Sequence, residues 1–224
     1  LSYLFRGTDL RTGEMVAIKQ LTVSRDVDEI AWQRFQREAE ALKGLDHPNI
    51  VHLRDTFRDG DFEYIVMEYI YGGSLFDRLK REGRLLLQEA LTIAAQLAGA
   101  LDHAHARGII HRDLKPENIY LESRPGNPEF VKILDFGIAK VMRGDSIDPQ
   151  SPQLTATGQT LGTLEYMSPE QLMGKQLDGR SDVYALGVVA YEMITGKLPF
   201  PDAKGPAGLI TARHDPAQVG LVPR

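Results

Sequence analysis

The sequence predicts an α+β chain in two lobes, a strand-rich lobe over residues 1–70 and a mainly helical lobe over residues 71–224. Three observations carry this prediction. Alternating and β-branched segments fill the first third, around a single helical stripe. A glycine pair at residues 72–73 then interrupts the pattern, and long apolar segments with helical spacing follow. A cleft between two such lobes is a common place for a ligand.

The first lobe is expected to contain two hairpins with a helix between them. "DLRTGEMVAIK" has the pattern of strand, turn and strand, and "IVHLRDTF" with "FEYIVMEYI" forms a second pair around the turn "RDGD". The helix is expected to begin at Asp28 and to stop at "DHPNIV", where proline breaks the pattern. Its apolar stripe consists of Ala31, Phe35, Ala39, Leu42 and Leu45.

The second lobe begins with a turn and a long helix. The charges around residues 78–84 are expected to form a solvated helix face and a turn. A long amphipathic helix is then expected to end at Gly108. Its stripe comprises Leu91, Ala94, Ala98, Leu101 and His105, and the histidines other than His111 are expected to be incidental.

The rest of the lobe combines short strands, a long loop and a further helix. Strands are expected at "NIYL" and "FVKILDFG", before a Gly-, Ser-, Thr- and Pro-rich segment over 141–168 that is expected to be a functional or disordered loop. "SDVYALGVVAYEMITG" is a helix with an N-cap candidate at Ser181 and a C-terminal glycine at Gly196. It is apolar nearly all round, so we expect it to be buried.

Composition narrows the function classes. The 224 residues are 42% apolar and 25% charged, with a formal net charge of −5, so no basic face for nucleic acid is expected. No apolar run reaches the length of a membrane span. The chain has no cysteine, which excludes disulfides and thiolate catalysis and fits a reducing cytosol. A cytoplasmic location is therefore expected, with a membrane anchor elsewhere in the full-length protein left open.

A charged stretch, "HRDLKPEN", interrupts two apolar segments. Asp113 and Asn118 lie in it, and Asp135 follows in "LDFG", where burial is costly unless the carboxylate meets a cation. Two carboxylates and an amide oxygen are hard ligands, suited to Mg²⁺ that shares phosphate oxygens. Lys19, after the strand "MVAI", offers a positive charge for a nucleotide phosphate, and Glu38 is a plausible partner for it.

In their order and spacing, "VAIK", "HRDLKPEN", "DFG" and "SPE" resemble the protein kinase superfamily, from about residue 2 to about residue 214. The resemblance implies a two-lobed kinase-like fold that binds ATP and Mg²⁺ and transfers phosphate to protein substrates. In it, Lys19 paired with Glu38 holds the α and β phosphates. Asp113 aligns the substrate hydroxyl, and Lys115 neutralises the transferred group. Asn118 and Asp135 hold Mg²⁺.

The resemblance also assigns the adenine site and the supporting residues. Ala17, Met67 as gatekeeper, Glu68, Ile70 and Tyr120 would surround adenine. Arg112 would meet a phosphate on the long loop, and Asp182 would hold the catalytic loop in place. An apolar spine between the lobes would contain Leu42, Leu53, His111 and Phe136.

The resemblance further points to the substrate class and to regulation. Lys115 in "DLKPEN", and Thr163 in "GTLEYMSPEQ", are typical of serine/threonine kinases, and "LDFGIAK" resembles the bacterial eukaryotic-like branch. In that branch, activating threonines lie six and eight residues before the position of Thr163, which are Thr157 and Thr155 here. A phosphate on them could order the loop against Arg112.

Some departures keep alternatives open. Compared with the family pattern, the glycine-rich loop that covers the phosphates and the final helices are expected to be missing, and Leu4 lies in the place of a valine near the end of that loop. Glu170 would thus be buried without its usual arginine, at a cost in stability. A pseudokinase that binds ATP as a scaffold is one alternative. A small-molecule kinase is another, although "GTLEYMSPEQL" favours a protein substrate.

Overall fold

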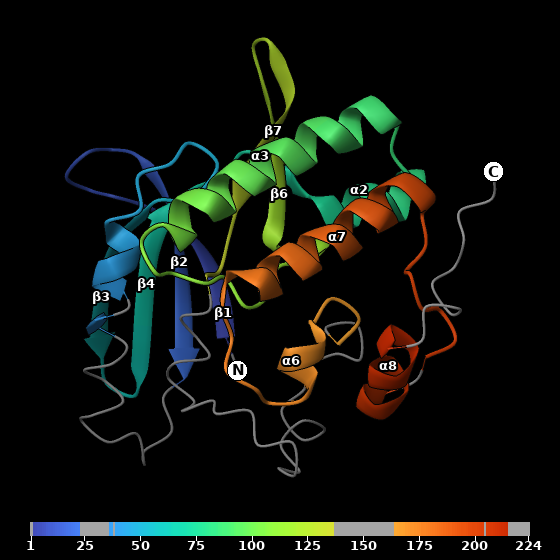
Figure 1. The fold of residues 1–224 in the computed structure, drawn as a ribbon. Helices are drawn as coiled ribbons and strands as arrows, with labels where there is room; N and C mark the ends of the chain where they lie inside the picture. Colours follow the sequence, from blue (N-terminus) through green and yellow to red (C-terminus); the bar gives the residue numbers. More distant parts are fainter. Residues whose placement is uncertain (1, 23–35, 38, 137–163, 204, 215–224) are drawn as a thin grey trace.

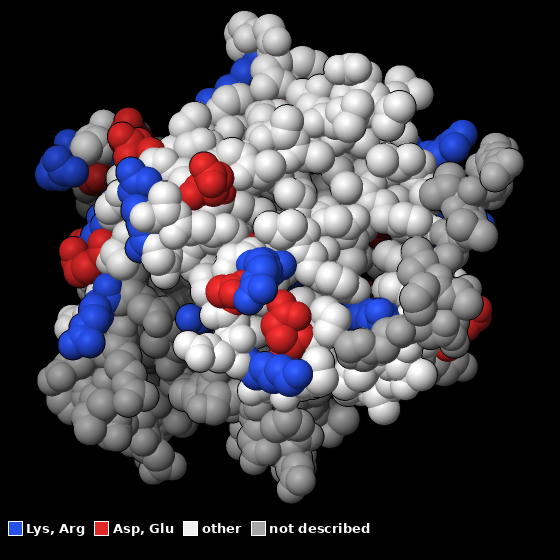
Figure 2. Space-filling view, viewed as in Figure 1, with Lys and Arg blue, Asp and Glu red and all other residues white. Residues whose placement is uncertain are grey.

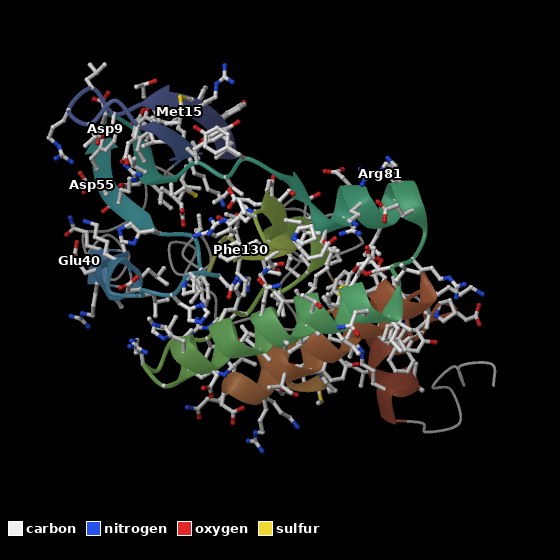
Figure 3. All side chains as sticks on the ribbon, turned by 90° about the horizontal axis from the view of Figure 1, so that it is seen from above. Asp9, Met15, Glu40, Asp55, Arg81 and Phe130 are labelled. Carbon is white, nitrogen blue, oxygen red and sulfur yellow. The ribbon has the colours of Figure 1, made fainter. Side chains whose placement is uncertain are left out.

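The computed structural model describes residues 2–22, 36–37, 39–136, 164–203 and 205–214. In this part of the chain, a four-stranded sheet lies beside a larger region built mainly of helices (Figure 1). Seen from above, Asp9, Met15 and Asp55 mark the sheet end of the molecule and Arg81 the opposite end (Figure 3). The predicted α+β class is confirmed, while the proposed lobe boundaries at residues 70 and 71 stay a prediction.

The sheet contains both predicted hairpins. Strands β1 (Ser2–Thr8) and β2 (Met15–Thr22) form one, and β3 (Leu53–Asp59) and β4 (Phe62–Glu68) form the other. All neighbours are antiparallel in the order β1-β2-β4-β3. The turn of the second hairpin places Gly60 at a φ of 58°, a left-handed conformation that glycine adopts without strain. The predicted helix before β3 is described only at 36–37 and 39–43, where Ala39 and Leu42 are buried.

A glycine connects the two regions through a close backbone approach. β5 (Gly73–Ser74) pairs with β6 (Ile119–Arg124), which also pairs with β7 (Asn127–Ile133). A Cβ on Gly72 would overlap the carbonyl oxygen of Leu121, so any larger residue would force these segments apart. The expected break at "YGGS" is thus a short strand, followed by α2 (Leu75–Glu82) with Ser74 as its N-cap.

The buried face of the long helix α3 (Leu87–His105) differs from the predicted stripe. The residues that it buries are Ala90, Ile93, Leu97, Ala100, Leu101 and Ala104. Leu91, assigned to the core by the pattern, is 52% exposed, and Ala98 is exposed as well. The helix is apolar on several faces, so spacing alone could not select the face that packs.

Helix α7 (Gly179–Thr195) packs beside α3 (Figure 1). Its N-cap is Asp178, not the predicted Ser181, because the Asp178 side chain accepts the Arg180 N–H. Gly196 caps the end with a φ of 69°, as predicted. The expected burial holds in full or in part for most of α7, although Val183 is 60% and Ile194 37% exposed. Much of the visible α3 and α7 surface carries no charged side chain (Figure 2).

The predicted solvated charges of residues 78–84 need a correction at Arg78. Its side chain is only 16% exposed, and its guanidinium contacts three carboxylates, on Glu82, Glu89 and Glu129. The pairing therefore ties α2 to the start of α3 and to β7. A helical pattern in α2 could not show this, because two of the partners lie outside that helix.

Two short helices complete the described part. α6 (Pro169–Leu172) is N-capped by Ser168, and α8 (Gly205–His214) lies next to it (Figure 1). Glu170 of α6 is only partly buried and accepts a hydrogen bond from Ser181 Oγ at 2.6 Å. The expectation of a buried glutamate without a partner was therefore wrong. No described helix is both long and apolar enough to span a bilayer.

Candidate active site

Lys19 reaches from the sheet into the helical region. It lies on β2 opposite Leu4 of β1 and Ile65 of β4, so these three residues share one face of the sheet. Ala17 and Met67 are paired on the same face. The Lys19 Nζ lies 2.6 Å from Asp135 Oδ2, and the Lys19 side chain is only 17% exposed. The ion pair thus joins two residues that the sequence analysis assigned to one site.

The charged stretch forms a second group of site residues. Lys115 Nζ lies 3.2 Å from Asp113 Oδ2. The Asn118 side chain donates from Nδ2 to Asp113 O at 2.8 Å and to Asp113 Oδ2 at 3.2 Å. The short helix η1 (Pro116–Asn118) sets this spacing, with Pro116 at its first position. The amide of Asn118 therefore holds the Asp113 carboxylate in place, next to an ammonium group.

Backbone contacts bring the two groups together. Leu134 N–H donates to Asn118 O at 2.8 Å, one residue before Asp135. His111 Nε2 bonds Leu134 O at 2.9 Å, and its ring lies 4.7 Å from that of Phe136. His111 is fully buried, which lowers its pKa and favours the neutral ring. It therefore acts as a packed support, as expected, and Asp135 is held with a φ of 57°.

Asp182 on α7 supports the loop formed by "HRDLKPEN", residues 111–118, which is called the catalytic loop below. Its carboxylate is 1% exposed and accepts the backbone N–H groups of His111 at 2.8 Å and Arg112 at 2.9 Å. A third contact, His105 Nε2 at 2.7 Å, corrects the expectation that this histidine is incidental. Arg112 has a φ of 65°, and the two Asp182 contacts hold this uncommon conformation in place.

The expected adenine residues lie near the end of β4. Met67 is buried, and it lines a cavity of about 30 Å³ with Leu42, Leu53 and Phe136, three of the predicted spine residues. Tyr120 lies on β6, where burial and then the charges of Asp77 and Asp135 raise its pKa. Ile70 directly follows the sheet and is half-buried.

Glu68 has a role that the sequence did not suggest. Its carboxylate accepts the His52 N–H at 2.7 Å and contacts Lys132 Nζ at 2.6 Å. Lys132 lies on β7 and its side chain is 7% exposed. The pair connects the two regions next to the residues expected to surround adenine. In the sequence, the single hint of this ion pair is that a lysine, Lys132, directly precedes the apolar residues of "ILDFG".

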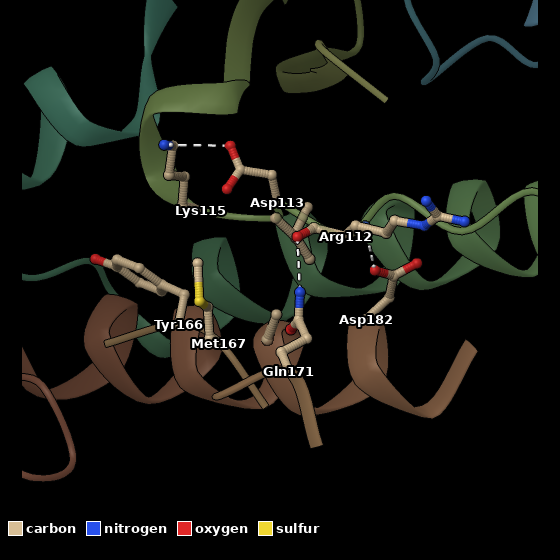
Figure 4. A pocket seen from close by; sticks show the side chains of 9 residues that line it. Arg112, Asp113, Lys115, Tyr166, Met167, Gln171 and Asp182 are labelled. Atoms are coloured by element: carbon tan, nitrogen blue, oxygen red, sulfur yellow. Dashed lines mark hydrogen bonds and ion pairs between the residues drawn. The ribbon is translucent and has the colours of Figure 1, made fainter. Parts of the chain in front are cut away.

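Residues 164–172, which comprise α6 and the segment before it, form one wall of the candidate site. Tyr166, Met167 and Gln171 line a cavity of about 10 Å³ together with Asp113 and Lys115 (Figure 4). Gln171 Nε2 donates to Arg112 O at 2.8 Å. Residues 164–172, the described part of the segment expected to dock a protein substrate, therefore lie directly beside residues 111–118.

Some predicted residues lie outside the part of the chain that the structure describes. They are Glu38, Thr155, Thr157 and Thr163. The Lys19–Glu38 pair and the proposed phosphorylation sites therefore stay predictions. Among the described residues, Lys19 contacts Asp135, and Asp113 contacts Lys115 and Asn118. The roles assigned to these residues stay predictions.

The fold and this site define a protein kinase-like domain. The chain belongs to the protein kinase domain family, whose profile matches residues 1–218. It is 48% identical over 199 residues to "Serine/threonine-protein kinase pkn3" of Myxococcus xanthus, covering 88% of this chain and 36% of that protein. It is 40% identical over 200 residues to "Serine/threonine-protein kinase PrkC" of Bacillus subtilis, covering 89% and 29%. The chain thus spans about a third of the length of these relatives.

Proposed function

We propose that this chain is the catalytic domain of a bacterial serine/threonine protein kinase, which transfers the ATP γ-phosphate to serine or threonine hydroxyls of proteins. The observation that carries the proposal is the Lys19–Asp135 contact across the two regions, beside the Asp113–Asn118 pair. The named activities of the bacterial relatives support the same chemistry.

The donor set fits a magnesium nucleotide. Asp135 offers a carboxylate, and Asn118 uses its Nδ2 for Asp113, which leaves the amide oxygen for a cation. Mg²⁺ in proteins is commonly held by one or two such ligands plus substrate phosphates. When bound, it would neutralise charge on the phosphate oxygens.

The remaining work falls to the protein's own residues. Lys19 would exchange its Asp135 partner for the α and β phosphates. Asp113 would accept the hydrogen bond of the substrate hydroxyl and orient it for in-line attack, and Lys115 would offset the charge on the transferred group. Such catalysis depends on positioning and on charge stabilisation more than on covalent chemistry.

Regulation through the long loop belongs to the same proposal. Phosphate on Thr155 or Thr157 would add nearly two negative charges per site, which Arg112 could bind. The Arg112 backbone is held by Asp182 and Gln171, which supports this role.

The test is incorporation of labelled phosphate from ATP into myelin basic protein by the complete protein, with Asp113→Asn as the matched variant. The wild type should transfer phosphate, whereas Asp113→Asn should lose transfer and keep ATP affinity. Nucleotide binding without any transfer by the wild type would favour the pseudokinase, and transfer to metabolites alone the small-molecule kinase. Unchanged turnover in Asp113→Asn would contradict the assigned role.

A further inference from the structure

Arg213 of α8 makes several contacts with residues 164–172, the wall beside Asp113 that is called the docking wall below. Its guanidinium donates to the backbone oxygens of Glu165 at 2.8 Å and Leu164 at 3.1 Å, and also to Met167 O. Three carbonyls within four residues are thus bound by one side chain. The rigid, many-donor fork of arginine suits this task, whereas a lysine ammonium could not reproduce its geometry.

Aromatic rings hold the guanidinium itself in position. Its central carbon lies 5.2 Å from the ring centroid of Tyr184 on α7, and 6.0 Å from that of Phe200. Arginine over an aromatic face gains cation–π attraction at such distances. Arg213 is therefore oriented from α7 and from the segment before α8, as well as by the wall that it contacts.

The wall also has its own apolar support on α8. Met167, Leu172 and Leu209 form a buried cluster separate from the main core. Leu164, Phe200 and Ile210 pack against this cluster. The segment before α6 is thus attached to α8 by side chains as well as by the Arg213 bonds.

The opposite side of the same segment faces the catalytic loop. Tyr166 and Met167 line the cavity that Asp113 and Lys115 share (Figure 4). Tyr166 Oη donates to Glu192 Oε2 on α7 at 2.6 Å. Arg213 therefore sets the backbone path of residues whose side chains border the place where a substrate hydroxyl would meet Asp113.

We propose that Arg213 is a positioning residue for the protein substrate: by binding the carbonyls of Leu164, Glu165 and Met167, it fixes the docking wall beside Asp113. The inference rests on the proposed kinase function. Small displacements of a substrate near the reacting atoms cost large factors in rate. No nucleotide-site residue contacts Arg213 among its described hydrogen bonds, so the effect should be confined to the protein substrate.

The experiment compares Arg213→Met and Arg213→Lys with the wild type in the complete protein. Methionine keeps an apolar stem of similar length without donors, and lysine keeps the charge without the fork. Arg81→Met is the control, because Arg81 is 68% exposed and pairs only with the neighbouring Glu82 in its recorded contacts. The readouts are transfer to myelin basic protein, ATP hydrolysis without acceptor, ADP affinity, thermal melting and hydrogen exchange of residues 164–172.

For Arg213→Met, kcat/KM for myelin basic protein should fall about tenfold or more, mainly through KM, since bonds to a charged donor are lost. ATP hydrolysis and ADP affinity should stay within about twofold. Arg213→Lys should recover only part of the loss, and hydrogen exchange over 164–172 should accelerate in both variants.

Equal losses in ATP hydrolysis, ADP affinity and protein transfer would overturn the proposal, since they would indicate a general structural role. Full recovery by Arg213→Lys would also overturn it, because charge alone would then suffice. If the wild type binds ADP but transfers no phosphate, the kinase proposal fails. The Arg213 contact is then judged by hydrogen exchange alone, and unchanged exchange over 164–172 overturns it.

Discussion

The ammonium of Lys132 lies 2.6 Å from the carboxylate of Glu68, joining β7 of the helical region to the end of β4 in the sheet. Lys132 also lies 3.4 Å from Ile50 O, in the loop that precedes β3. Next to this pair, Val51 N–H bonds Ile133 O at 2.9 Å, and Ile133 N–H bonds Asn49 O at 2.8 Å. The two regions are therefore held together, next to the residues expected to surround adenine, by an ion pair and a backbone bridge.

Replacing Lys132 by methionine should lower the free energy of unfolding by about 1–3 kcal/mol, because Glu68 loses its counter-charge in a partly buried place. The loss could be as small as the lower end of this range because Glu68 is partly exposed and also accepts the His52 N–H. Urea unfolding of Lys132→Met, Glu68→Gln and the double variant would measure the coupling. Additive losses would mean that the pair contributes nothing of its own.

Glu63 should make the protein less stable as the pH rises. It is buried on β4, and burial raises its pKa to about 7 despite Arg58 at 3.5 Å. The folded state therefore keeps this proton to a higher pH than the unfolded chain, whose carboxyl has the ordinary value of 4.5. The contribution of Glu63 to the free energy of unfolding is therefore fully present below pH about 4.5 and is lost as the pH rises through about 7.

Glu63→Gln should consequently raise the free energy of unfolding at pH 8 by about 1–3 kcal/mol, and should flatten its fall between pH about 5 and 7. Melting temperatures at several pH values would check this. Glu40→Gln, at a carboxylate that is 69% exposed, is the matched control. A Glu63→Gln profile parallel to the wild type would show that Glu63 titrates normally.

Asp182→Asn should reduce kcat about 10- to 100-fold with little change in ATP affinity, because the loop with Asp113 loses charge-assisted bonds. His105→Phe should have a smaller effect, since the two backbone contacts remain. Asp178→Asn serves as the control on the same helix, as asparagine is an equally good N-cap. Comparable losses at Asp178 and Asp182 would remove the special role of Asp182.

Autophosphorylation should occur on Thr155 or Thr157. Mass spectrometry after incubation with Mg-ATP should locate phosphate there, and the double alanine variant should lose most of the activation. Arg112→Ala should make the phosphorylated protein resemble the unphosphorylated one, because the new charge then lacks its cation. Phosphate found only on other residues would exclude this form of activation.

Arg78→Met should destabilise the protein by about 2–4 kcal/mol, since three carboxylates converge on a side chain that is 16% exposed. Arg81→Met, in the same helix but 68% exposed, should change stability by less than about 0.5 kcal/mol. Equal effects of both variants in denaturant unfolding would contradict the burial argument.

The sequence alone determined the order of the two hairpins, α3, β6, β7 and α7, and its motifs indicated the family and the residues of the candidate site. Lys19, Asp113, Asn118 and Asp135 could be found because polar residues between apolar segments are a local pattern, and the resemblance to protein kinases implied their roles. The same local logic placed Leu91 and Ala98 of α3 in the core, although both are exposed and Leu101 of that stripe is buried. It also chose Ser181 in place of Asp178 as the N-cap of α7, since both residue types can cap a helix.

Only the tertiary structure decided which distant side chains meet. His105 bonds Asp182 across 77 positions, Lys132 pairs with Glu68 across 64, and Arg213 reaches Met167 across 46. None of these partners follows from spacing, because each depends on how helices and strands pack. The physical reason is that a buried charge must find a counter-charge or hydrogen bonds wherever packing brings them, and packing is a property of the whole fold.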